Sequence, residues 1–187
     1  EVRVYITRAE EGVARLSTML NRMTEATRLE QSLQGAERER FELNGLIAGC
    51  VQGYGSVYPQ ANLQLSLPAQ PLPLNGAPEL MAQLLDKLVA NAVDFAEPGT
   101  PIRVALEAQG GEVQLSVANR GPSLPDAGQR LFSAMVSVRR PSTGGEAHLG
   151  LGLYVARLIA EFHGGSILAA NLPGGDGVAV RVRMPAP

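Results

Sequence analysis

The first thirty residues carry a heptad pattern, which restricts the fold more than any other feature of the chain. Apolar or small side chains recur at alternating spacings of four and three residues: Val2, Ile6, Ala9, Val13, Leu16, Leu20, Met23 and Thr27. This spacing places one stripe of side chains along one side of a long helix. A single helix cannot bury such a stripe. We therefore expect a dimeric helical bundle, which the length of the stripe favours, or a helix that folds back on its own domain.

After a charged connector over residues 34–42, the pattern becomes a mixture of helix and strand periods. Apolar residues at helical spacing predict helices, and alternation around glycine turns predicts strands and hairpins. The predicted helices span residues 44–57, 78–95 and 150–163, with a short further helix over 129–138. The predicted strands span residues 62–67, 102–108, 113–118, 166–170 and 178–184. Residues 71–78 contain three prolines and predict an irregular connection.

The composition is that of a folded domain without an electrostatic preference for nucleic acid. The chain of 187 residues is 45% apolar and 18% charged, and its net charge is -2. No apolar stretch approaches the roughly 20 residues that cross a bilayer. We expect this chain to be cytoplasmic, and it can be part of a longer membrane protein. The single cysteine, Cys50, lacks partners for a disulfide or a metal site and is expected to be a small buried side chain.

Three motifs carry residues suited to phosphate or metal chemistry. Gly150 and Gly152 directly precede an apolar helix, and this is the form of a phosphate-binding turn or of a tight turn without a ligand. Asn91 interrupts the apolar face of the helix over 78–95, as a hydrogen-bonding amide or as an oxygen ligand for Mg²⁺. Asn119 stands at the end of a strand before the glycine turn at Gly121, which is again a candidate site or only a turn.

Taken in order, these motifs resemble the ATP-binding domain of sensor histidine kinases, in the superfamily shared with gyrase, MutL and Hsp90-type chaperones. Four boxes match in the family's order, and the resemblance covers the chain from about Phe41 to its end. They are Asn91 for the N box, Asn119-Arg120-Gly121-Pro122-Ser123 for the first glycine box, Leu131-Phe132 for the F box, and Gly150-Leu151-Gly152-Leu153 for the second glycine box.

The resemblance implies an α+β fold of the Bergerat type over residues 39–187. This is a two-layer sandwich, in which about three helices cover one face of a mixed, mostly antiparallel sheet. Residues 1–38 would be the second helix of the dimerisation hairpin. The first helix of that hairpin, which carries the phosphoacceptor histidine, is not in this sequence. Neither His148, at the glycine box, nor His163, at a helix end, replaces it.

The resemblance also implies ATP and Mg²⁺ as ligands and assigns roles to the matched positions. Asn91 would coordinate Mg²⁺. Lys87, one helical turn earlier, is not a family residue; its position suits a phosphate contact as a second catalytic residue or a solvated pair with Asp94. Asn119 would accept a hydrogen bond from the adenine amino group, and residues 121–149 would form the ATP lid. The implied nucleotide-binding residues are Asn91, Asp94, Phe95, Asn119, Gly121, Ser123, Leu124, Phe132, Arg139, His148, Leu149, Gly150, Leu151, Gly152 and Leu153.

Some of these positions depart from the family pattern. Lys87 stands where many members carry Asn or His, and Asp94 stands where Lys is common. Asn119 replaces the usual aspartate of the first glycine box. Its amide oxygen can still accept from adenine, and the missing negative charge can weaken binding without inactivating the site. Ser123 and His148 each replace a glycine.

The resulting functional hypothesis is a protein histidine kinase of a two-component system, which passes the γ-phosphate of ATP to a histidine and then to a response-regulator aspartate. The chain would form a homodimer through its N-terminal helix and bind no nucleic acid. The full-length protein would be anchored upstream in the inner membrane. The alternative is a dimeric scaffold or switch with a degenerate nucleotide site and no kinase activity. Binding of Mg·ATP separates the two hypotheses.

Overall fold

The structure, a computed structural model, describes residues 2–124 and 151–187, and the chain divides into units at residues 1–36 and 37–187. The first unit is a single helix, α1 (Val2–Gly35). Apolar side chains of the heptad stripe are more than half exposed along it, among them Ile6, Val13, Leu16 and Leu20. The predicted long helix is present, and these four side chains of its apolar stripe are exposed.

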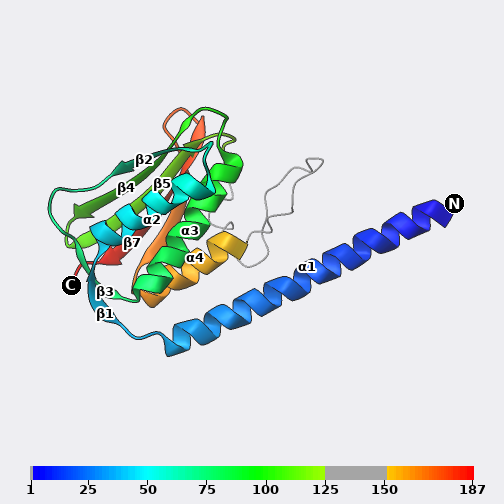
Figure 1. Ribbon diagram of the computed structural model, residues 1–187, viewed down its shortest axis with the longest axis horizontal. Coiled ribbons are helices and arrows are strands. Elements are labelled where there is room, and N and C mark those ends of the chain that lie inside the picture. The colour runs from blue at the N-terminus through cyan, green and yellow to red at the C-terminus, as the bar shows by residue number, and fades with distance from the viewer. Residues whose placement is uncertain (1, 125–150) are drawn as a thin grey trace. The chain divides into compact units, whose positions relative to one another are not determined.

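The second unit is built on a five-stranded sheet with the order β2-β4-β5-β7-β6 (Figure 1). Its strands are β2 (Asn62–Ser66), β4 (Pro101–Gln109), β5 (Glu112–Arg120), β6 (Ser166–Asn171) and β7 (Gly177–Pro185). Only β2 and β4 pair in parallel, and the other three pairs are antiparallel. The predicted mixed, mostly antiparallel sheet and both of its hairpins are confirmed.

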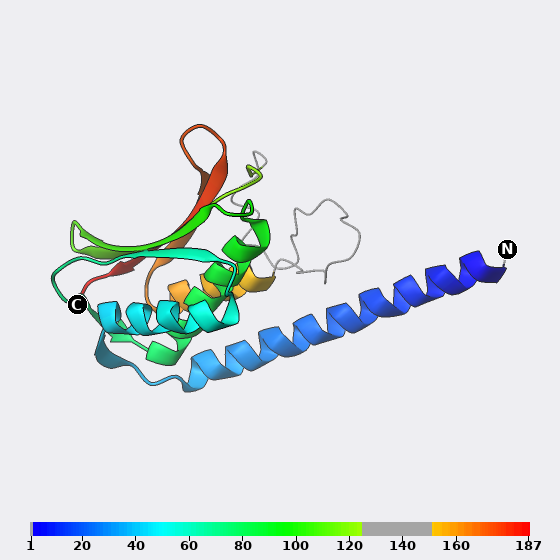
Figure 2. The same cartoon turned by 45° about the horizontal axis from the view of Figure 1, so that its top comes forward.

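Three helices cover one face of this sheet, as Figure 2 shows. They are α2 (Leu43–Val57), α3 (Pro78–Phe95) and α4 (Leu151–Phe162). Alternate residues of β5, Val113, Leu115 and Val117, are buried against the helices. α3 lies between α2 and α4 and buries seven side chains, from Leu80 to Ala92. Its first residue is Pro78, a favourable residue for the first turn of a helix. The predicted two-layer architecture is confirmed.

A second, two-stranded sheet was not predicted from the sequence. β1 (Glu39–Glu42) pairs antiparallel with β3 (Pro73–Gly76), so the predictions of a connector and an irregular connection were wrong at these residues. Phe41 pairs with Leu74, which is fully buried. Four-residue strands show almost no periodicity, and this pair forms because distant segments meet in the folded unit.

Two smaller predictions have different outcomes. The Cys50 side chain is only half-buried, on α2. The helix predicted over 129–138 lies outside the described residues. None of the helices in the described part of the chain is long and apolar enough to span a membrane.

Candidate functional site

One side of α3 forms the base of the candidate site. Lys87, Asn91 and Phe95 follow one another at intervals of four residues, which places them along the same side of the helix. The eight residue steps from Lys87 to Phe95 span about 12 Å along the helix. The Lys87 and Asn91 side chains are half-buried, and Phe95 is 36% exposed although it is a large apolar residue. This side of α3 is thus not closed by the packing of the described residues.

The beginning of α4 lies beside Lys87. A Cβ atom added to Gly152 would lie 3.9 Å from both Cβ and Cδ of Lys87, so the lysine stem runs past the first turn of α4. The first backbone N–H groups of a helix have no partner within the helix, and its dipole favours anions there. The first turn of α4 contains no acidic side chain. A lysine and a helix N-terminus together suit a phosphate group.

The opposite end of α4 is joined to the beginning of α3 by a buried histidine. His163 Nε2 accepts a hydrogen bond from the Ala77 N–H (3.1 Å), and Nδ1 lies 2.8 Å from the Ile159 carbonyl oxygen. The ring is therefore neutral, with its proton on Nδ1. Burial lowers the pKa of His163 below its ordinary value, and the nearby Arg38 charge lowers it further. Together with the contact between Gly152 and Lys87, this bond sets α3 and α4 antiparallel.

The end of β5 approaches α3 near Phe95. Asn119 is 7% exposed, and its Nδ2 donates to the Arg120 carbonyl oxygen at 3.0 Å. No described residue donates a hydrogen bond to its Oδ1 atom. Gly121 has φ 154°, and a Cβ at this position would lie 2.1 Å from the Phe95 carbonyl oxygen. Only glycine fits this close approach. A buried acceptor needs a donor, and since none of the described residues supplies one, the site suits a ligand that donates to Asn119.

The turn between β6 and β7 holds the residues that follow Asn119. The Gly121 N–H donates to the Asp176 carbonyl oxygen (3.1 Å), and the Arg120 and Asp176 side chains form a half-exposed ion pair. The Leu124 N–H donates to Asn171 Oδ1 (2.7 Å), and Asn171 Nδ2 donates to the Leu124 carbonyl oxygen (3.2 Å). Asn171 was not predicted as a site residue, because an Asn two residues before Pro173-Gly174-Gly175 is typical of an ordinary turn.

The other residues predicted for the site have different places. Asp94 and Ser123 are exposed, Leu124 and Leu153 are half-buried, and Leu151 begins α4. Phe132, Arg139, His148, Leu149 and Gly150 lie outside the described residues. The structure therefore brings the N box, the first glycine box and the start of the glycine-box helix to one side of α3.

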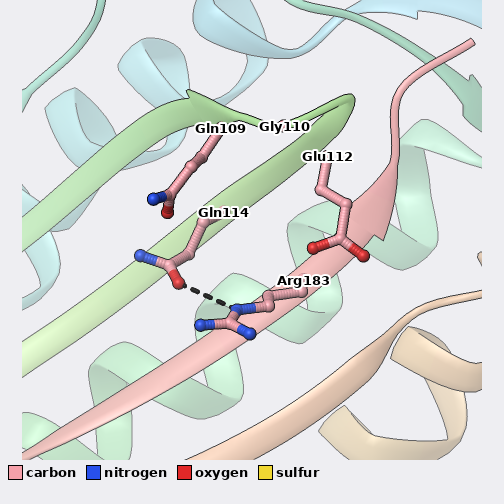
Figure 3. A pocket seen from close by; sticks show the side chains of 5 residues that line it. All are labelled: Gln109, Gly110, Glu112, Gln114 and Arg183. Carbon is pink, nitrogen blue, oxygen red and sulfur yellow. Dashed lines mark hydrogen bonds between the residues drawn. The ribbon is translucent and has the colours of Figure 1, made fainter.

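A separate polar hollow of about 290 Å³ lies at the other end of β5 (Figure 3). It is lined by Gln109, Gly110, Glu112, Gln114 and Arg183. Arg183 Nε donates to Gln114 Oε1 at 3.2 Å across the strands β7 and β5. Because the hollow surrounds the start of β5 and Asn119 stands near its end, it is not part of the candidate site.

Residues 76–187 match the family described as histidine kinase-, DNA gyrase B-, and HSP90-like ATPase. The chain belongs to this family. The matched region contains all four boxes of the sequence analysis, and membership in this ATPase family implies that the domain binds ATP. The resemblance to the ATP-binding domain of sensor histidine kinases is confirmed.

Individual relatives agree with this assignment. Sensor histidine kinase TrcS of Mycobacterium tuberculosis is 27% identical over 187 residues, which cover 96% of this chain and 36% of the relative. The chain thus spans about a third of the length of TrcS. The catalytic domain of histidine kinase ThkA has a TM-score of 0.69 at 25% identity, over 80% of this chain and 96% of that domain. Full-length ShkA in complex with AMPPNP has the same fold, with a TM-score of 0.71 at 23% identity over 98% of this chain and 38% of ShkA.

Proposed function

We propose that this chain is the ATP-binding catalytic portion of a two-component sensor histidine kinase. Residues 39–187 would form the ATP-binding domain, and residues 1–38 the second helix of a dimerisation hairpin. The observation that carries the proposal is the arrangement along α3. Gly152 lies against the Lys87 side chain, Gly121 lies against the Phe95 carbonyl oxygen at the end of α3, and Asn91 stands midway between Lys87 and Phe95 along the helix.

The two ends of this arrangement suit the two ends of ATP. At the Phe95 end, the Oδ1 atom of buried Asn119 would accept a hydrogen bond from the adenine amino group, beside Gly121. At the Lys87 end, the ammonium group of Lys87 and the first N–H groups of α4 would bind the phosphates. The exposed Phe95 ring supplies apolar surface near the base. The intervening distance of about 12 Å along α3 allows both ends to be held at once.

Asn91 would hold Mg²⁺ through its amide oxygen, which is a ligand type that this cation accepts. The cation, when bound, supplies positive charge that neutralises the phosphates. Within the described residues, no cluster of three or more His, Cys, Asp or Glu side chains suits a metal ion. Lys87 is a fixed positive charge one turn from Asn91, and we propose that it assists transfer by holding the phosphates in position. Phosphoryl transfer depends mainly on such positioning and neutralisation.

The proposal extends to partners and location. Two copies would associate through α1, whose apolar stripe is exposed in one chain. The phosphoryl group would pass from a histidine on the other hairpin helix to the receiver domain of a response regulator. The similarity to sensor kinases such as TrcS and KdpD supports a cytoplasmic position in a membrane-anchored protein. The degenerate scaffold remains the competing function, because Asn119 lacks the charge of the family's usual aspartate.

Calorimetric titration with ATP, with and without Mg²⁺, tests the proposal. We expect Mg²⁺-dependent binding, and we expect Asn91→Ala to lose the Mg²⁺-dependent part of the affinity. Asn75→Ala, at an exposed asparagine of β3, is the matched control and should bind as the unaltered chain does. No binding at millimolar ATP would refute the kinase proposal. An unchanged Mg²⁺ requirement in Asn91→Ala would refute the role given to that residue.

A further inference from the structure

Asn171 lies on the same cross-strand row as the adenine-reading candidate, Asn119. Val178 of β7 pairs with Asn119 on one side and with Asn171 on the other. Residues directly opposite one another in a sheet point to the same face, so all three lie on the face that carries the helices. Two strand spacings separate the two asparagines, which is about 10 Å. The chain from Gly121 to Leu124 bridges this distance.

The Asn171 side chain holds the far end of that bridge with both of its polar atoms. Its Oδ1 accepts from the Leu124 N–H at 2.7 Å, and its Nδ2 donates to the Leu124 carbonyl oxygen at 3.2 Å. This pattern reproduces the pair of bonds that a neighbouring strand would form with one residue. The near end is held by the Asp176 carbonyl oxygen, which accepts from the Gly121 N–H. The first glycine box is therefore fixed at both ends by one turn.

The turn that supplies these contacts is itself well ordered by internal bonds. The Leu172 N–H donates to the Gly177 carbonyl oxygen (2.9 Å), and the Gly175 N–H donates to the Leu172 carbonyl oxygen (2.9 Å). Gly177 also meets β5 closely, because a Cβ there would lie 2.2 Å from the Asn119 carbonyl oxygen. A rigid support of this kind restricts where the loop, and hence the Asn119 amide, can lie.

We propose that Asn171 is a positioning residue for the base end of the nucleotide site. By holding the backbone of Leu124, it keeps the first glycine box in the conformation that accepts adenine, without contacting the nucleotide. This inference rests on the proposed function, because it assumes that the base lies beside Asn119 and Gly121. It predicts that loss of Asn171 weakens binding of the base and leaves binding of the phosphates unchanged.

The test compares Asn171→Ala, Asn171→Asp and the control Asn75→Ala. Asn171→Ala removes both bonds, whereas Asn171→Asp keeps the acceptor for the Leu124 N–H and replaces the donor by an oxygen that faces the Leu124 carbonyl oxygen. Without nucleotide, hydrogen exchange of the Leu124 amide should be about tenfold faster in Asn171→Ala and nearly unchanged in Asn171→Asp. The ATP dissociation constant should rise about tenfold in Asn171→Ala, and less in Asn171→Asp. Binding of inorganic triphosphate, which lacks the base, should be equal in all variants.

Three results would overturn the proposal. Unchanged exchange at Leu124 in Asn171→Ala would show that the clamp does not restrain the loop. Faster exchange with unchanged ATP affinity would show that the clamp does not position the site. Equal weakening of ATP and triphosphate binding would indicate a general loss of structure, which thermal unfolding of the same variants reports independently. If the unaltered chain binds no ATP at all, the proposed function itself fails, and the exchange measurement still tests the clamp.

Discussion

At the scale of single residues, Asn119 is the side chain whose environment most directly suggests a ligand. It is buried, and in the described part of the chain only its Nδ2 atom forms a hydrogen bond. An amide oxygen accepts from the amino group of adenine but has nothing to accept from the carbonyl oxygen that inosine carries at the same position. The difference in affinity between ATP and inosine triphosphate therefore reports the hydrogen bond to Asn119 Oδ1 alone.

We predict that Asn119→Ala reduces the affinity for ATP about tenfold and abolishes the preference for ATP over inosine triphosphate. The physical reason is that the unaltered chain leaves Asn119 Oδ1 without a donor when inosine is bound, which costs about 1–3 kcal/mol. Competition titrations with both nucleotides measure the preference. If Asn119→Ala keeps the same ATP preference, the adenine amino group is read elsewhere.

Gly121 provides a second prediction, based on steric fit. Gly121→Ala should destabilise the protein by about 2 kcal/mol more than Gly111→Ala, because the new Cβ would meet the Phe95 carbonyl oxygen. Gly111 is the matched control, since it also has a positive φ but no atom within 4 Å of an added Cβ. Each variant also carries a backbone cost of about 1–3 kcal/mol for its positive φ. Denaturant unfolding measures the difference, and equal stabilities would contradict the close approach of β5 to α3.

The site was only partly predictable from the sequence, for reasons visible at single residues. Asn91, Asn119 and Gly152 stand in patterns that the family shares, so their order along the chain was informative. Asn171 acts through two hydrogen bonds to a backbone 47 residues away. No local pattern encodes such a contact, because Asn at the end of a strand is common for reasons of turn geometry alone.

At the scale of elements, the spacing of apolar residues predicted most of the helices and strands that the structure contains. The helices that became α2 and α3 and the strands of both hairpins carry apolar residues at 3.6 and 2.0 spacing, since one face of each is buried. β1 and β3 were not predicted, because a segment of four residues is too short to show a period and because Pro73 argues against a strand. The two strands are about 30 residues apart in the sequence, and they pair only because the rest of the unit brings them together. Neither segment alone carries a pattern that predicts this.

The joint between α3 and α4 gives a pH prediction. The folded pKa of His163 is lowered from 6.5, so the unfolded chain binds a proton more readily than the folded protein does. The contribution of neutral, buried His163 to the free energy of unfolding is fully present above pH 6.5. It decreases as the pH falls from 6.5 through the lower pKa of the folded protein. Protonation of Nε2 would break its bond to the Ala77 N–H and place a charge near Arg38.

We therefore expect His163→Gln to remove part of the stability loss between pH 8 and pH 5.5, because glutamine has an acceptor oxygen but no titrating proton in this range. Urea unfolding of both proteins at the two pH values measures the effect. The other histidine, His148, is present in both proteins, so its contribution cancels in the comparison. An identical pH dependence in the variant would show that the pKa of His163 is the same in the folded and unfolded states, contrary to the effect expected from its burial.

At the scale of the whole molecule, the chain joins a domain with a closed core to a helix with an exposed stripe. The core of the ATP-binding unit is covered by its own elements, as the full burial of Leu84, Leu115 and Ile159 indicates. In α1, the stripe residues Ile6, Val13, Leu16 and Leu20 are each more than half exposed. Exposed apolar stripes of this length are characteristic of helices that associate.

We predict that the chain is a dimer whose association depends on this stripe. The double variant Leu16→Glu/Leu20→Glu should be monomeric at concentrations where the unaltered chain is dimeric, because it places charges in the apolar contact between helices. Ala14→Glu/Thr18→Glu introduces the same charges on the opposite, polar side of the heptad and should remain dimeric. Sedimentation equilibrium distinguishes the two states, and thermal unfolding of the ATP-binding unit should be alike in both variants. Dimers that persist in Leu16→Glu/Leu20→Glu would place the contact between copies outside the heptad stripe, and the proposed hairpin role of residues 1–38 would then fail.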